Sequence, residues 1–244
     1  QLQNIRDYPS NKMPEEAWEK LRIPLSEKGE GAEQVYNSIA ENLLPYSIYT
    51  TRPQFWGWVA GTGSPYGVLV DLLLSSRNSG AGNMETIPLW LHSINWIKEL
   101  LRVPNDYSGV FVGGGSEASF TGLAVARNAK ANVDMKTEGM QSVKRKMVLY
   151  GSQEMHHCLE RSVELLGLGS DALRWIPVDD HYRINVIELE KAITEDKTNG
   201  LHPFCIIGNA GTVNTGAFDD LNALADICQR EDMWLHVDGA FGAW

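Results

Sequence analysis

Long hydrophobic runs are missing from this sequence: no apolar stretch approaches the roughly 18 residues of a membrane-spanning helix, so no membrane partner is expected. Positive charge is scarce, and the 21 Lys and Arg against 31 Asp and Glu argue against a nucleic-acid partner. Cysteine is rare, and Cys158, Cys205 and Cys228 have no metal-ligand spacing, which predicts free thiols in a reducing cytoplasm. Residues 1–4 show neither an initiator Met nor a signal peptide, so we expect both ends to be cut.

The chain does contain enough apolar residues to bury a core, since 43% of its residues are hydrophobic and 21% are charged. Its first part predicts short helices broken by proline and glycine, one at 14–21 and a second at 32–44. An aromatic, glycine-rich segment follows at 55–63. Apolar residues then recur at helical spacing over 87–101, which predicts an amphipathic helix there.

From residue 109 onward, short apolar runs alternate with helical stretches. This alternation predicts an α/β fold with a mainly parallel sheet flanked by helices. Residues 204–207 are apolar without alternation, which suits a strand covered on both faces. Asn185 with Glu188 predicts a capping box at one helix start. The expected strands are 110–112, 147–150, 173–177, 204–208 and 234–237, and the expected helices are 116–131, 156–168, 186–198 and 221–230.

A glycine-rich turn, Gly-Gly-Gly-Ser-Glu-Ala at 113–118, follows an expected strand and opens an expected helix. Glycines let the backbone approach a ligand, and a helix start offers free amides to a phosphate. The alternative is a tight turn in which Ser116 caps the helix. The turn is neither a Walker motif nor the G-x-G-x-x-G of dinucleotide-binding folds.

Two adjacent histidines, His156 and His157, follow another expected strand. A neutral imidazole can stack on an aromatic ring or transfer protons, and the alternative is a histidine that is merely packed or exposed. A metal site is disfavoured, because helical ligands usually stand four residues apart. The polar loop 209–216 suits the lining of a polar ligand but equally suits an ordinary connection.

Asp238 ends an apolar strand, the place where open α/β sheets usually carry their chemistry. A partly buried carboxylate there needs a cationic partner: a metal, an arginine or a protonated ring nitrogen. A Walker-B role would need a P-loop, which the sequence lacks. A pyridinium nitrogen fits, because a carboxylate keeps it protonated and the ring then accepts electrons from a carbanion.

Taken together, these motifs resemble the group II pyridoxal-phosphate-dependent amino-acid decarboxylases, the relatives of glutamate and aromatic-L-amino-acid decarboxylase. The likeness extends over nearly the whole chain and keeps the order of the motifs. It rests on segments 52–57, 96–101, 114–118, 211–219 and 236–240 together with His156.

The resemblance implies a fold-type I cofactor domain over 51–244 and a dimer-wrapping helical segment over 1–50, with active sites shared in a homodimer. Its cofactor is pyridoxal 5'-phosphate. By similarity, Gly115 and Ser116 hold the phosphate and Asp238 pairs with the ring nitrogen. His156 stacks over the ring, Ala240 packs beneath it, Thr212 lies near its oxygen and Trp58 borders the substrate.

Two departures from the family pattern stand out. Family members carry a Schiff-base lysine a few dozen residues beyond the strand-end Asp, whereas this chain ends six residues after Asp238, so we expect a truncation before that lysine. Val213 stands where aromatic-amino-acid members have a second Thr, and His157 and Cys158 replace small hydroxyl residues. The second departure bears on the substrate more than on the reaction.

The leading interpretation is a cytoplasmic homodimer of amino-acid metabolism that converts an L-amino acid to the amine and carbon dioxide. Phe55, Trp56 and Trp58 favour an aromatic over an acidic substrate, although tryptophan-rich segments are more often core. An aminotransferase or carbon–carbon lyase shares the same electron-sink logic. The remaining alternative is a non-catalytic fragment or homologue that keeps the cofactor fold for assembly.

Overall fold

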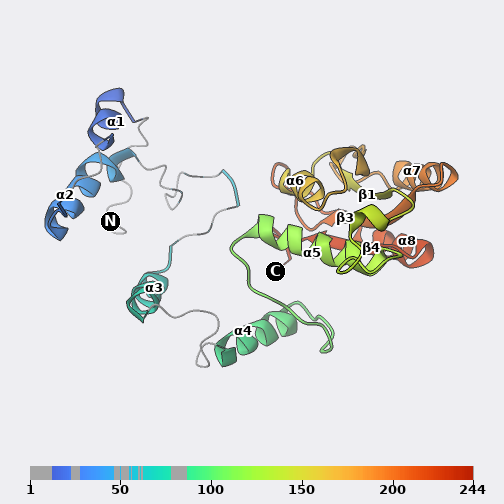
Figure 1. The fold of residues 1–244 in the computed structure, drawn as a ribbon, viewed down its shortest axis with the longest axis horizontal. Helices are drawn as coiled ribbons and strands as arrows, with labels where there is room; N and C mark the ends of the chain where they lie inside the picture. Colours follow the sequence, from blue (N-terminus) through green and yellow to red (C-terminus); the bar gives the residue numbers. More distant parts are fainter. Residues whose placement is uncertain are drawn as a thin grey trace. The chain divides into compact units, whose positions relative to one another are not determined.

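The computed structural model describes residues 13–22, 28–46, 50, 55, 57–59, 61, 63–77 and 87–243. The chain forms two compact units, Gln1–Ser79 and Gly80–Trp244 (Figure 1). The expected division into 1–50 and 51–244 stays a prediction. None of the helices within the described ranges is both long enough and apolar enough to cross a membrane.

The secondary structure of the first unit is helical over the described residues. Helix α1 (Glu15–Leu21) begins after Pro14 with two acidic residues, as predicted, and α2 (Ala32–Asn42) ends two residues earlier than predicted, ahead of the 3-10 turn η2 (Leu44–Tyr46). Helix α3 (Pro65–Arg77) was not expected, because its apolar residues follow one another without a helical period.

The second unit carries a four-stranded parallel sheet in the order β2-β1-β3-β4. Each strand coincides with an expected apolar run, so four of the five predicted strands are confirmed. Strand β3 is buried along nearly its whole length, as its unbroken apolar sequence predicted. The bounds are β1 Met147–Ser152, β2 Leu173–Ile176, β3 His202–Asn209 and β4 Trp234–Asp238.

Two helices cover each face of this sheet, which gives three layers (Figure 1). Helices α5 and α6 bury Leu123 and Leu159 against one face, and α7 and α8 bury Leu189 and Leu224 against the other. The four predicted helices are confirmed with small shifts at their ends. The bounds are α5 Gly115–Lys130, α6 Cys158–Leu165, α7 Val186–Thr198 and α8 Leu221–Glu231, with 3-10 turns η3 Met140–Ser142 and η4 Ser170–Ala172.

Of the two reciprocal hydrogen-bonding interactions of the capping box predicted at the start of α7, one is confirmed. The Asn185 side chain accepts hydrogen bonds from the amides of Ile187 and Glu188. The Glu188 carboxylate does not return the bond to Asn185, because it pairs with Lys191 at 2.6 Å. The amide of Asn185 donates instead to the carbonyl of Pro177.

The predicted strand 110–112 is wrong. These residues pair with no strand among the described part of the chain, where the sheet contains only β1 to β4. They run beside α4 (Ile87–Leu100), and the ring of Phe111 lies edge-on to Trp90 with 6.1 Å between centroids. Phe111 of this run therefore contacts a helix, and the run does not join the sheet.

The three cysteines are free and buried. Cys205 lies in β3, and burial raises the pKa of its thiol well above the ordinary value. Burial likewise raises the pKa of Cys228 to about 11. Both groups therefore remain thiols near neutral pH.

A buried polar cluster joins α7 to the sheet. The hydroxyl of Tyr150 in β1 donates to Asp196 of α7 at 2.8 Å, and the guanidinium of Arg174 in β2 donates two bonds of 2.9 Å to the same carboxylate. Burial alone raises the pKa of Asp196, but the bonds from Arg174 and Tyr150 outweigh it and hold that pKa below its ordinary value of 3.8. The cluster therefore favours the charged carboxylate.

Arg174→Gln is expected to lower the free energy of unfolding by about 2 kcal/mol near neutral pH, because Asp196 is then a buried charge without its cation. A folded-state pKa below the unfolded value stabilises the protein above pH 3.8 and loses that contribution as pH falls through the folded value. Urea unfolding at neutral pH and at about pH 3 measures both effects. Arg183→Gln is the control, since it breaks an exposed pair with Asp179. Equal losses for the two variants would contradict the prediction.

Candidate functional site

The carboxyl ends of β1, β3 and β4 lie at one edge of the sheet. Strand β3 stands between the other two, and its last residue, Asn209, is opposite Asp238 in the register with β4. All pairings are parallel, so the segments that follow the strands emerge at this edge. Ligands of open parallel sheets bind at such an edge.

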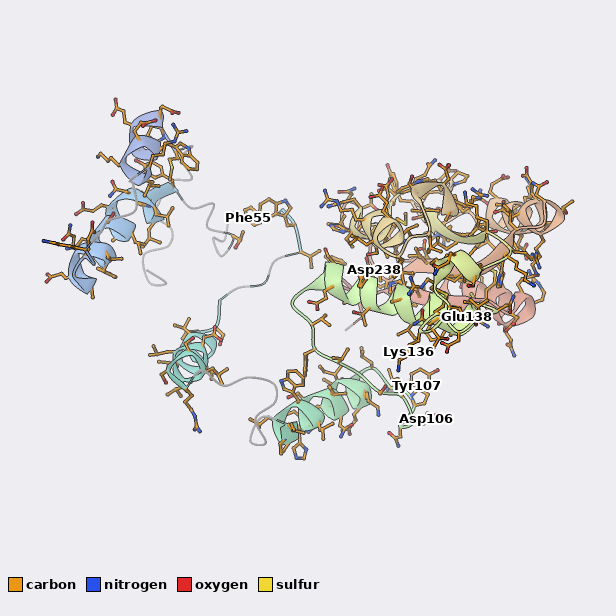
Figure 2. The ribbon with its side chains drawn as sticks, viewed as in Figure 1. Phe55, Asp106, Tyr107, Lys136, Glu138 and Asp238 are labelled. Carbon is orange, nitrogen blue, oxygen red and sulfur yellow. The ribbon has the colours of Figure 1, made fainter. Side chains whose placement is uncertain are left out.

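Helix α5 points its amino end toward the same edge. Near its carboxyl end, Lys130 pairs with Asp232, just before β4 begins, at 2.7 Å. Further back along the helix, Gly122 lies against the ring of His236, well inside β4. The helix therefore runs antiparallel to β4, and at 1.5 Å per residue its first turn lies near the level of Asp238. Asp238, labelled in Figure 2, belongs to the strand that packs on α5.

The glycine-rich turn opens α5 without a side-chain cap. Gly114 occupies the N-cap position, so the alternative in which Ser116 caps the helix is wrong. The amide of Gly113 donates to Glu117 at 2.7 Å. A Cβ on Gly114 or Gly115 would meet nothing within 4 Å, so the space in front of the first turn is open to a ligand. The turn offers backbone amides and the Ser116 hydroxyl to an anion.

His156 lies between β1 and the start of α6. Its Nδ1 accepts a hydrogen bond from the amide of Cys158 at 3.2 Å, so a neutral ring carries its proton on Nε2. The ring of His157 lies beside it, with 4.2 Å between centroids and a tilt of 38°. The helix begins two residues later than expected, at Cys158, which leaves both histidines outside its first turn.

Thr212 sits in a tight hairpin that follows β3. The side chain is buried, and its hydroxyl lies 2.6 Å from that of Thr215 and accepts a bond from the amide of Ala217. Gly211 has a φ of +88°, and a Cβ there would collide with the ring of Phe241. The hairpin and the turn after β4 therefore pack directly on each other.

Asp238 is half-buried at the end of β4. One carboxylate oxygen accepts the amide of Ala240 at 3.2 Å, and its backbone carbonyl accepts the amide of Ala210 at 2.9 Å. Within the described ranges no Lys or Arg forms an ion pair with this carboxylate. Ala240 is exposed beside it. The negative charge is thus available to a cationic ligand.

His236, for which no role was predicted from the sequence, lies two residues before Asp238 and so on the same face of β4. Its Nε2 is buried and has no hydrogen-bond partner among the described residues. Burial lowers the pKa of His236, and the nearby Asp238 opposes this only partly. A Cβ on Gly122 would come within 2.8 Å of the ring, so glycine is needed for the helix to fit. The His-x-Asp spacing on a strand is the signal that could have identified it.

Trp58 belongs to the first unit and is exposed, with its ring 5.3 Å from that of Phe55, which Figure 2 labels. Trp56, Ala60 and Thr62 of the aromatic segment and the neighbouring 52–54 lie outside the described residues. The role of Trp58 beside the substrate stays a prediction. The part of the chain that the structure describes holds no group of three His, Cys, Asp or Glu suited to a metal.

Comparison with known proteins shows which family this chain resembles. The pyridoxal-dependent decarboxylase conserved domain matches residues 14–243. Aromatic-L-amino-acid decarboxylase of Bacillus atrophaeus is 38% identical over 231 residues, 92% of this chain and 46% of that protein. Cysteine sulfinic acid decarboxylase of Mus musculus is 30% identical over 95% of this chain and 47% of that protein.

The fold agrees as well. The crystal structure of mouse CSAD in apo form has a TM-score of 0.86 at 30% identity, over 97% of this chain and 50% of that one. The fold is therefore fold-type I, as predicted, and the cofactor of the family is pyridoxal 5'-phosphate. The chain spans about half the length of the curated relatives it matches. Over that span, it belongs to the pyridoxal-dependent decarboxylase family.

Proposed function

We propose that the protein catalyses the pyridoxal-phosphate-dependent decarboxylation of an L-amino acid to the amine and carbon dioxide. The observation that carries this proposal is the Asp238 carboxylate at the sheet edge, unpaired with any Lys or Arg among the described residues. When bound, pyridoxal phosphate supplies an electron sink for the carbanion that loss of carbon dioxide leaves behind. Asp238 is the group that would keep its ring nitrogen protonated.

The donor set at the sheet edge fits this cofactor chemically. The amides of Gly115 and Ser116, with the Ser116 hydroxyl, would hold the phosphate, and the space before them is open. Ala240 is exposed next to Asp238 and would contact the lower face of the ring. Thr212 would lie near the ring oxygen, although its hydroxyl also serves the hairpin.

His156 would cover the opposite face of the ring. Because its Nδ1 accepts the amide of Cys158, the neutral ring presents Nε2–H as a donor. Such a donor could hold a substrate carboxylate oxygen or move a proton at Nε2. The neighbouring ring of His157 supports this orientation of His156.

The proposed substrate is an aromatic L-amino acid, bordered by Trp58. The support is the 38% identical aromatic-L-amino-acid decarboxylase and the exposed Trp58 beside Phe55. A cysteine sulfinic acid decarboxylase at 30% identity makes an acidic substrate the competing choice.

The proposed assembly is a cytoplasmic homodimer with shared active sites. Large apolar side chains such as Tyr36 of α2 and Leu69 and Leu72 of α3 are exposed within the first unit, and such surface favours association. The buried free thiols agree with a reducing compartment. Sedimentation of the protein expressed from its full coding sequence tests the dimer, and a monomer at micromolar concentration would contradict it.

To test the function, the protein expressed from its full coding sequence is loaded with pyridoxal phosphate. It is then incubated with one amino acid at a time: L-tryptophan, L-tyrosine, L-phenylalanine, L-glutamate and L-cysteine sulfinate. Carbon dioxide and the organic product are measured together. Amine formed in equal amount with carbon dioxide supports decarboxylation, and an oxo acid would indicate an aminotransferase instead. Protein that binds the cofactor but releases no carbon dioxide from any amino acid would overturn the proposal.

A further inference from the structure

A buried carboxylate that none of the proposed cofactor contacts uses lies at the base of the hairpin after β3. Asp219 is only 5% exposed, and its side chain accepts three N–H bonds. Oδ1 accepts the amide of Ile184 at 2.7 Å, while Oδ2 accepts the amide of Asn209 at 2.7 Å and Nδ2 of Asn209 at 2.9 Å. Both oxygens therefore face donors.

Two of these three bonds come from the end of β3, and the third comes from Ile184, just before α7. Asn209 is the last residue of β3, opposite Asp238, and the next amide, that of Ala210, donates to the Asp238 carbonyl. Nδ2 of Asn209 also donates to the hydroxyl of Ser152, the last residue of β1, at 3.3 Å. Asp219 thus binds the end of β3 directly, and it is linked to the end of β1 through the Asn209 side chain and to the end of β4 through Ala210.

The segments fixed in this way carry most of the proposed cofactor contacts. Thr212 stands three residues beyond Asn209, in a hairpin closed by the Ala210–Phe218 bridge and by the bond from the Asp219 amide to the Asn209 carbonyl. His156 stands four residues beyond Ser152. Binding sites tolerate displacements of only about 0.5 Å, so the geometry of these strand ends matters.

We propose that Asp219 is a positioning residue, which holds the ends of β1, β3 and β4 in the arrangement that receives the cofactor. The inference rests on the proposed function and adds to it a residue that does not touch the cofactor. The position requires a carboxylate, because both side-chain oxygens of Asp219 accept N–H bonds. An asparagine in its place would turn its NH₂ group toward the amide of Ile184 or that of Asn209 in either orientation of the side chain, and two donors would then face each other.

Asp219→Asn tests this in the protein made from its full coding sequence. The dissociation constant for pyridoxal phosphate, followed by quenching of tryptophan fluorescence, is expected to rise about tenfold, because a buried donor loses its acceptor. Amide hydrogen exchange at Ile184 and Asn209 is expected to accelerate, while exchange in the centre of β1 is unchanged. The second measurement needs no cofactor.

Asp220→Asn is the matched control, since it makes the same chemical change at the neighbouring residue. Asp220 is exposed and caps α8 by accepting the amide of Ala223 at 3.1 Å, a task that asparagine performs equally well. The affinity of this variant for pyridoxal phosphate and its amide hydrogen exchange are expected to equal those of the wild type. Loss of affinity in this variant too would overturn the assignment to Asp219.

Asn209→Ala decides the matter if Asp219→Asn does not fold. It removes the Nδ2 bonds to Asp219 and Ser152 and keeps the backbone bond, so a rise of about threefold in the dissociation constant is expected. Unchanged affinity, or faster exchange throughout the sheet, would overturn the positioning role. Wild-type protein that binds no pyridoxal phosphate would overturn the proposed function, and the exchange measurement would still show whether Asp219 holds the strand ends.

Discussion

Asp238→Asn is expected to lower kcat for carbon dioxide release about 10³-fold, the size of effect seen when one preorganised electrostatic group is removed. A neutral amide cannot hold a ring nitrogen in its protonated form, so the carbanion is no longer stabilised. The fold should persist, because Asn can still accept the amide of Ala240 and the backbone bond from Ala210 is unaffected. Steady-state kinetics with amine detection, alongside thermal unfolding, measures both.

Asp226→Asn is the control for that variant, since Asp226 is exposed on α8, away from the strand ends. It is expected to keep wild-type activity. An Asp238→Asn protein that retained most of the wild-type kcat would contradict the role of Asp238 on which the proposed function depends. Loss of activity with a large fall in thermal stability would assign Asp238 a structural role instead.

Gly211→Ala is expected to destabilise the protein by about 3 kcal/mol, by adding strain at a positive φ to a steric collision. Gly211 has a φ of +88°, and the new methyl group would collide with the ring of Phe241. That collision pushes apart the Thr212 hairpin and the turn after Asp238, so affinity for pyridoxal phosphate should fall as well. Urea unfolding and cofactor titration measure the two effects.

Gly216→Ala separates the two causes, because it lies in the same hairpin with a φ of +68° but its Cβ would stand 3.8 Å from Phe241, an ordinary contact. It should show only the conformational strain, about 1 kcal/mol. Equal destabilisation by the two variants would mean that the contact with Phe241 contributes nothing.

The sheet could be predicted because its signal is local. The unbroken apolar run of β3 and the cap at Asn185 each occupy a few consecutive residues, and both are found as expected. The residues 110–112 have the same apolar character, but pairing depends on a neighbour, and here the neighbour is the helix that carries Trp90. A short apolar run does not specify what covers it.

The residues of the candidate site likewise fall into those that could be predicted from the sequence and those that could not. The strand-end position of Asp238 follows from one apolar run, so it could be predicted from sequence. The roles of Asp219 and His236 could not, because each depends on residues distant in the chain, such as Ile184 for Asp219 and Gly122 for His236. Such contacts appear only once the strands and helices are assembled.

The direction of α5 has a practical consequence for preparing the protein. A helix start that offers uncapped amides to one phosphate offers them to any small oxyanion of similar charge. Under the proposed function, inorganic phosphate and sulfate in a purification buffer therefore compete with the cofactor for the same amides. Affinities measured in HEPES will consequently exceed those measured in phosphate, and the difference reports how strongly the first turn of α5 holds the anion.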